Sequence, residues 1–227
     1  MSPSTTAVET EYHPQITSIR QQIASVSGDL LASLPVIEQL SSEARRGIIA
    51  RYSAVLEGNF IYWMTGAYLA ARSRESRIII EDNLLTEVRD SHPGMLRRFA
   101  LAAYSVPSDL DALAVYPRLS AVRLFVGRLS AAPLMAMMAF FEGFIQGFMP
   151  YLAELAKRQG SEEMEYTDVH GVCDIEHSEE LFRALELEME LAGDSREASE
   201  YLFEGVYLLR DLIKAMISSP GIFRNVN

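Results

Sequence analysis

Apolar residues recur every three or four positions along almost the whole chain, and this periodicity constrains the fold more than any other feature. The first example runs through Ile16, Ile19, Ile23 and Leu30. Such spacing places apolar side chains on one face of an α-helix. No run of Val, Ile or Thr alternates with the period of two that a half-buried strand would show. The sequence therefore predicts an all-α protein.

Turn residues and prolines divide this periodic pattern into separate helices. We predict helices over residues 16–34, 41–72, 77–89 and 94–104, one long or two stacked helices over 117–158 with a kink at Pro133, and two last helices over 163–192 and 194–218. Proline ends or opens a helix because it lacks a backbone N–H and restricts the preceding residue. We expect a single domain of about seven helices over 16–227, preceded by a flexible arm over 1–15.

Composition and charge exclude several classes of protein. The 227 residues are 49% hydrophobic and 22% charged, which is globular composition. A formal net charge of −11 argues against a nucleic-acid partner, and a single cysteine excludes an intramolecular disulfide or a Cys-rich zinc site. We see no signal peptide, and Pro133, Glu142 and Gln146 interrupt the most apolar stretch, over 131–149. We therefore expect a cytoplasmic protein with no membrane partner.

Two histidines and an aspartate share one predicted helix, in the pattern H-x3-D-x2-H. They are His170, Asp174 and His177. At about 100° per residue, offsets of four and seven place the three side chains within roughly 60° of one another. Two imidazoles and a carboxylate on one stripe suit a first-row metal such as iron. The alternative is three unrelated polar residues on an exposed face, because several glutamates follow directly.

Glu142 is a carboxylate in an almost wholly apolar helix. A buried ionised carboxylate without a partner costs several kcal/mol or becomes protonated, and a metal cation removes that cost. A protonated Glu142, bound to a neighbouring helix or facing a polar cleft, is the alternative. Gln146 lies one turn later, where it would contact the substrate or support a metal ligand.

A third cluster surrounds Glu87 and His92. These residues are five apart, about 140° round a straight helix, so they converge only if the helix breaks between them. The string over 90–93, which ends in Pro93, supplies that break and lets His92 turn back toward Glu87. Asn83 shares the face of Glu87, and we expect this face, not that of Glu81, to point inward.

Together the three clusters supply three histidines, two glutamates and one aspartate. These ligand types suit two iron or manganese ions in a helix-lined core. A ferritin-like dimetal protein would instead need two E-x-x-H pairs on separate helices. Only the stretch from Asp174 to His177 approaches that form, so a ferritin-like protein fits poorly.

The order Glu87, His92, Glu142 and then H-x3-D-x2-H resembles the haem-oxygenase-like dimetal oxidases and oxygenases. The resemblance covers most of the chain from about Arg77. It implies a haem-oxygenase/TenA-like seven-helix bundle and a non-haem pair of Fe(II) ions that activates O2 for natural-product biosynthesis. It also implies roles for the metal-site residues: Glu87, His92 and a carboxylate would hold one iron, His170, Asp174 and His177 the other, with Glu142 bridging or terminal and Glu57 as an extra ligand.

Departures from related proteins limit other interpretations. Haem oxygenases bind haem through a histidine on the first helix, whereas this chain offers only His13, ahead of the first periodic residue. TenA-type thiaminases use a cysteine nucleophile, and the only thiol here, Cys173, is more simply a small buried residue. A metal-free helical binding or regulatory protein stays open as an alternative.

We expect the substrate to be a small aliphatic amino acid, oxidised by C–H abstraction to give desaturation, C–N bond formation or cyclisation. Oxidative decarboxylation of a fatty acid and N-oxygenation are the alternatives. Aromatic residues around Phe60 and Phe141 are candidates for the substrate pocket or plain core. Arg210 is a candidate clamp for a substrate carboxylate or a surface residue in a salt bridge. An external reductant and a homodimer are compatible with this interpretation.

Overall fold

Helices make up most of the part of the chain that the structure, a computed structural model, describes: residues 14–193, 196 and 198–218. They are α1 (Pro14–Ala32), a 3₁₀ helix (Ile37–Gln39), α2 (Ser42–Ala70), α3 (Arg74–Arg89), α4 (His92–Ala102), α5 (Asp109–Val126), α6 (Ala131–Arg158), α7 (Glu165–Ala192) and α8 (Glu204–Ile217). No strand occurs among these residues, which pack into one compact unit. The prediction of an all-α fold is confirmed.

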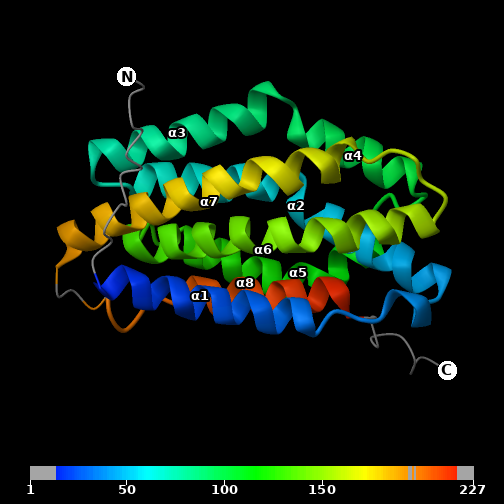
Figure 1. The fold of residues 1–227 in the computed structure, drawn as a ribbon, viewed down its shortest axis with the longest axis horizontal. Coiled ribbons are helices and arrows are strands. Elements are labelled where there is room, and N and C mark those ends of the chain that lie inside the picture. The colour runs from blue at the N-terminus through cyan, green and yellow to red at the C-terminus, as the bar shows by residue number, and fades with distance from the viewer. Residues whose placement is uncertain (1–13, 194–195, 197, 219–227) are drawn as a thin grey trace, which may run out of the picture.

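Helix α6 lies at the centre of the bundle and packs against α1, α2, α7 and α8 (Figure 1). Its sequence is apolar on nearly every side, so the helix is buried on nearly every side. Among the described residues it is also the one helix long and apolar enough to cross a membrane, and 83% of its apolar window is buried inside the protein. A core helix has the same length and composition, so this is weak evidence for a membrane segment.

Helix α2 bends sharply in its middle, beside the candidate site. Glu57 and Gly58 leave helical geometry, and Gly58 adopts a φ of 79°. Glycine tolerates this left-handed backbone because it has no Cβ. Asn59 follows the bend and turns its amide back to the carbonyl of Val55 at 2.8 Å. The predicted single helix over 41–72 is therefore two helical segments that meet at an angle.

The break between α5 and α6 differs from the prediction. Helix α5 begins at Asp109, where the capping box of Ser108 starts it, and the chain turns over 127–130, where Leu129 has a φ of 54°. Pro133 does not kink a helix there. It lies in the first turn of α6, where a missing backbone N–H costs nothing.

The two chain ends also differ from the predicted boundaries. Helix α8 begins at Glu204 rather than at 194, because the chain makes turns before it that bury Ala198 and Leu202. At the other end, α1 begins at Pro14. The predicted arm over 1–15, with His13, therefore lies almost wholly outside the described residues.

Candidate metal centre

The corner between α3 and α4 brings Glu87 and His92 together. Ser91 precedes α4 with a φ of 58°, so the chain turns a corner between α3 and α4. Nδ1 of His92 then lies 2.7 Å from Oε1 of Glu87, and both side chains are buried. The prediction that the helix breaks here and turns His92 back toward Glu87 is confirmed. The inward face of α3 also carries Asn83, as predicted, while Glu81 is exposed.

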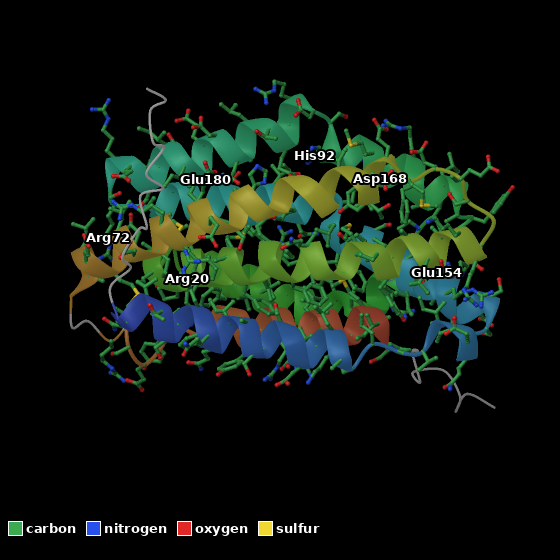
Figure 2. All side chains as sticks on the ribbon, in the orientation of Figure 1. Arg20, Arg72, His92, Glu154, Asp168 and Glu180 are labelled. Atoms are coloured by element: carbon green, nitrogen blue, oxygen red, sulfur yellow. The ribbon has the colours of Figure 1, made fainter. Side chains whose placement is uncertain are left out.

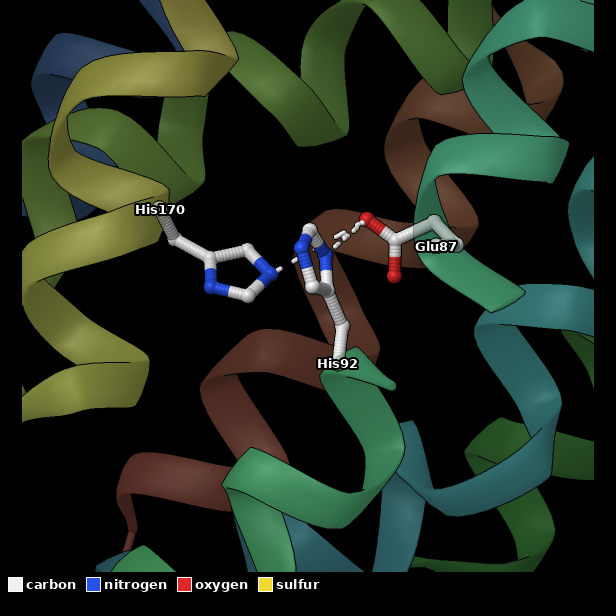
Figure 3. Close-up of side chains that lie close together, drawn as sticks. All are labelled: Glu87, His92 and His170. Atoms are coloured by element: carbon white, nitrogen blue, oxygen red, sulfur yellow. Dashed lines mark hydrogen bonds and ion pairs between the residues drawn. The ribbon is translucent and has the colours of Figure 1, made fainter. Parts of the chain in front are cut away.

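His170 of α7 completes a cluster of three potential ligands with Glu87 and His92 (Figure 3). One ligand atom from each residue lies within 4.8 Å of the other two. Nε2 of His170 is 3.9 Å from Oε1 of Glu87, and the two imidazole rings are 4.5 Å apart between centroids. Three buried groups that can bind one cation therefore meet from α3, α4 and α7.

The hydrogen bonds of the two histidines determine which nitrogens face the cluster. Nδ1 of His170 lies 2.8 Å from the carbonyl oxygen of Tyr166. A carbonyl only accepts, so Nδ1 carries the proton and Nε2 keeps a lone pair. In the same way, a proton that Nδ1 of His92 donates to Glu87 leaves the lone pair of this imidazole on Nε2. Metal-binding histidines commonly donate their second nitrogen to a carbonyl or a carboxylate in this manner.

Burial is the largest influence on the charge of His170, and it lowers the pKa of this imidazole below its ordinary value. Glu87 and the carbonyl of Tyr166 act in the opposite direction, whereas His92 and His177 lower the pKa further. The net result favours neutral His170 at physiological pH. Neutral imidazole is the form that binds a metal.

A cavity of about 30 Å³ opens beside the cluster. Such a space holds about one or two water-sized ligands. Six polar residues line it: Glu87, His92, Glu142, His170, Tyr52 and Tyr166. Glu142 is only 4% exposed. The rest of its lining is apolar: Leu56, Phe60, Ile61, Pro93, Leu96, Phe141 and Ile145. No lysine or arginine is among the described residues that line it.

The structure supports the positions of the remaining predicted ligands only in part. Glu142 shares the cavity wall with the cluster. His177 is half-buried on α7 and close enough to His170 to lower its pKa by charge. Asp174 belongs to α7, but its side chain lies outside the described residues. Glu180, marked in Figure 2 on the same helix, accepts a 3.0 Å hydrogen bond from Asn83.

Three other candidates lie away from the cluster. Glu57 is exposed at the bend of α2 and binds Arg97, so the structure does not bring it to the proposed ions. Gln146 is half-buried and does not line the cavity. Arg210 binds the adjacent Asp211 at 2.9 Å, which matches the salt-bridge alternative and not a clamp in the cavity.

Sequence reasoning missed a pair of tyrosines behind His170. The hydroxyls of Tyr52 and Tyr166 are 2.7 Å apart, and the Tyr166 ring lies 4.3 Å from the ring of His170 between centroids. Tyr166 precedes His170 by one helical turn, and this spacing was the only available signal. Tyr52 comes from α2, and nothing in the sequence indicated that it would reach α7.

Comparison with known proteins gives no further guidance. No protein-family model, curated protein or solved structure matches the chain. The geometry of the buried cluster is therefore the basis for any functional interpretation.

Proposed function

We propose that this protein is an O2-dependent non-haem diiron oxidase or oxygenase that oxidises a small aliphatic amino acid. We infer with it a haem-oxygenase/TenA-like arrangement of the helices. The observation that supports the proposal best is the buried cluster of Glu87, His92 and His170, whose ligand atoms lie within 4.8 Å of one another beside an apolar cavity. Buried charged and titratable groups gathered at a cavity are typical of functional sites.

The donor groups fit iron. One carboxylate and two imidazoles leave positions open on a first-row metal, as in non-haem Fe(II) oxygenases. The hydrogen bond between His170 and the carbonyl of Tyr166 holds the imidazole in the tautomer that a metal requires. A second ion would take Glu142 from the cavity wall with His177 and Asp174 from α7. Glu87 would bind an ion directly or orient His92 for it.

When bound, an Fe(II) pair would supply the electrons that activate O2. The chain's own residues would position and protect this chemistry. The apolar wall, formed by Leu56, Phe60 and Ile61 on α2 and by Phe141 and Ile145 on α6, would exclude water from the reacting bond. The Tyr166 carbonyl keeps the proton on Nδ1 of His170, so the imidazole stays neutral and fixed.

The cavity lining bears on the substrate. Glu87 and Glu142 are its only charged groups besides the histidines, and no described cationic side chain lines it. With two ions bound, Glu87 and Glu142 would serve as metal ligands, so the charge of the lining does not select the amine or the carboxylate end of an amino acid. The apolar side chains would contact its aliphatic part. The same apolar side chains would contact the hydrocarbon chain of a fatty acid, so oxidative decarboxylation is the second candidate. Either substrate is larger than the present cavity of about 30 Å³, so the wall would move apart to admit it.

Anaerobic titration with Fe(II) tests the metal site. We expect saturation near two ions per chain and loss of binding in His170→Ala, His177→Ala and Glu142→Ala. His13→Ala and the exposed Glu81→Gln are matched controls that should bind as the wild type does. Saturation near one ion would contradict the diiron proposal. Failure to bind any iron would favour the metal-free binding protein instead.

Oxygen consumption tests the substrate. The iron-loaded protein is supplied with a library of aliphatic amino acids and fatty acids under air. We expect an amino acid to accelerate the consumption of O2. Acceleration by fatty acids alone would replace the first candidate with the second.

A further inference from the structure

Helix α5 is apolar on two opposite sides, but the described structure covers only one of them. Its inner side buries Val115, Val122 and Phe125 against α2 and α8. Its outer side carries Leu110, Leu113, Tyr116, Pro117, Ser120 and Leu124, which we call the outer stripe. The four large members other than proline are between 59% and 74% exposed. Surface helices of globular proteins are normally polar on the side that faces water.

The outer stripe itself carries no charged residue and runs over 15 residues, about 21 Å of helix. Of the charged residues within this span, Asp111 and Arg118 lie roughly 140–160° round the helix from Leu113, and Arg123 lies roughly 80° from it, at the flank of the stripe. Asp111 is buried and binds Arg46 of α2. A stripe of this length and composition indicates that another surface covers it.

We propose that the outer stripe is a two-fold interface at which α5 packs antiparallel against α5 of a second copy of this chain. With the symmetry axis near Tyr116 and Pro117, Leu110 faces Leu124 of the other copy. Leu113 faces Ser120, so a large side chain meets a small one. The stripe is therefore complementary in shape to a second copy of itself, as a two-fold interface requires.

The charges at the ends of the stripe agree with this direction. Asp109 lies in the first turn of α5, and Arg123 lies in its last turn and is also exposed. Arg123 donates Nη1 to Asn59 at 2.7 Å, which holds its guanidinium on the outer flank next to α2. Antiparallel pairing places Asp109 of each copy beside Arg123 of the other, and symmetry forms this ion pair twice. A parallel pairing would instead put like charges together.

The net charge of −11 disfavours a lipid surface as the occupant. Anionic membranes attract basic segments and repel an acidic protein. A second copy brings an uncharged stripe and two complementary ion pairs. The dimer interface lies on α5, whereas the candidate metal centre is formed by α3, α4 and α7, so the two proposals can be tested separately.

Sedimentation velocity of the full chain at micromolar concentrations tests the interface. We expect a species of twice 25.4 kDa. Leu113→Glu, within the stripe, should sediment as a monomer with unchanged helical circular dichroism. Leu85→Glu on α3 is the matched control, since Leu85 is also an exposed leucine, and it should leave the dimer intact. A monomeric wild type, or a dimeric Leu113→Glu variant, would overturn the proposal.

Two further measurements test the direction of packing and the occupant. Asp109→Arg should weaken the dimer about tenfold, and adding Arg123→Asp should restore most of that loss. Tyr116→Cys should form an intermolecular disulfide under mild oxidation, whereas Leu85→Cys should not. Failure of the double variant to recover would overturn the antiparallel arrangement. Binding of the monomer to anionic vesicles through the same stripe would assign it to lipid and overturn the proposal.

Discussion

Asp111 is a single residue whose hydrogen bonds connect two helices, α5 and α2. Its carboxylate accepts a hydrogen bond from the hydroxyl of Ser108 at 2.6 Å and two from the guanidinium of Arg46 at 3.1 and 3.2 Å. It also accepts the backbone N–H of Ser108, which closes the capping box of α5. One buried carboxylate therefore starts α5 and attaches it to α2.

Asp111→Asn should destabilise the protein by about 1.5–3 kcal/mol, because it weakens charged hydrogen bonds in a buried position. Burial by itself would raise the pKa of Asp111, but the bonds from Arg46 and Ser108 outweigh it and hold the pKa below its ordinary value. A lowered folded-state pKa adds stability at pH values above the ordinary aspartate range, near 4, and this stability is lost as the pH falls through the folded-state pKa.

Urea unfolding at about pH 7 and about pH 3 measures this contribution. The difference between wild type and Asp111→Asn should be largest at the higher pH and shrink at the lower one. Asp82→Asn, an exposed aspartate on α3 outside the proposed interface, is the control and should change stability much less. An equal loss at both pH values would contradict the assigned role of the carboxylate charge.

At the scale of elements, the bend in α2 positions the wall of the candidate site. Leu56 lines the cavity before the bend, and Phe60 and Ile61 line it after the bend. The bend depends on the left-handed backbone of Gly58. A straight α2 would move one of these two groups away from the ligands on α3, α4 and α7.

Gly58→Ala should lower stability by about 1–2 kcal/mol, because a Cβ disfavours the left-handed backbone. Space is not the cause, since an added Cβ would meet no atom within 4 Å. Gly28→Ala in α1 is a matched control: its Cβ would also meet nothing, and its backbone is helical. That control should gain about 0.5–1 kcal/mol. Thermal unfolding of both variants measures the contrast, and a stabilising Gly58→Ala would contradict the argument.

At the scale of the whole molecule, four titratable side chains are buried round one cavity in an otherwise apolar part of the interior. Glu87, His92, Glu142 and His170 are all buried among apolar helices. Burying such groups costs free energy unless partners compensate for it. A cation bound to the folded state would offset part of this cost, so metal binding would raise the free energy of unfolding.

A metal at about 100 times its dissociation constant should stabilise the fold by about 2.7 kcal/mol. For a chain of this length that corresponds to a rise in Tm of roughly 5–10 °C. Differential scanning calorimetry with and without Fe(II) or Mn(II) measures the shift, and a chelator should reverse it. Glu87→Gln should reduce the shift, whereas Glu81→Gln should keep it in full. The same shift in both variants would place the bound metal elsewhere.

The sequence by itself determined the local features of this protein. Its periodicity established the helices, because apolar spacing is a property of neighbouring residues. The helix break over 90–93 and the inward face of α3 were also predictable, since both follow from a few adjacent positions. The contact between Glu87 and His92 could therefore be predicted from the sequence alone.

Only the tertiary structure decided how distant helices meet. It brought His170 of α7 to Glu87, placed Tyr52 behind it, and turned Glu57 outward to Arg97 at the bend of α2. These outcomes depend on how whole helices pack, and the period of a single segment carries no information about its partner. For the same reason, the sequence did not show that the outer stripe of α5 would stay exposed. An apolar residue in a sequence favours burial, but the sequence does not identify the surface that covers it.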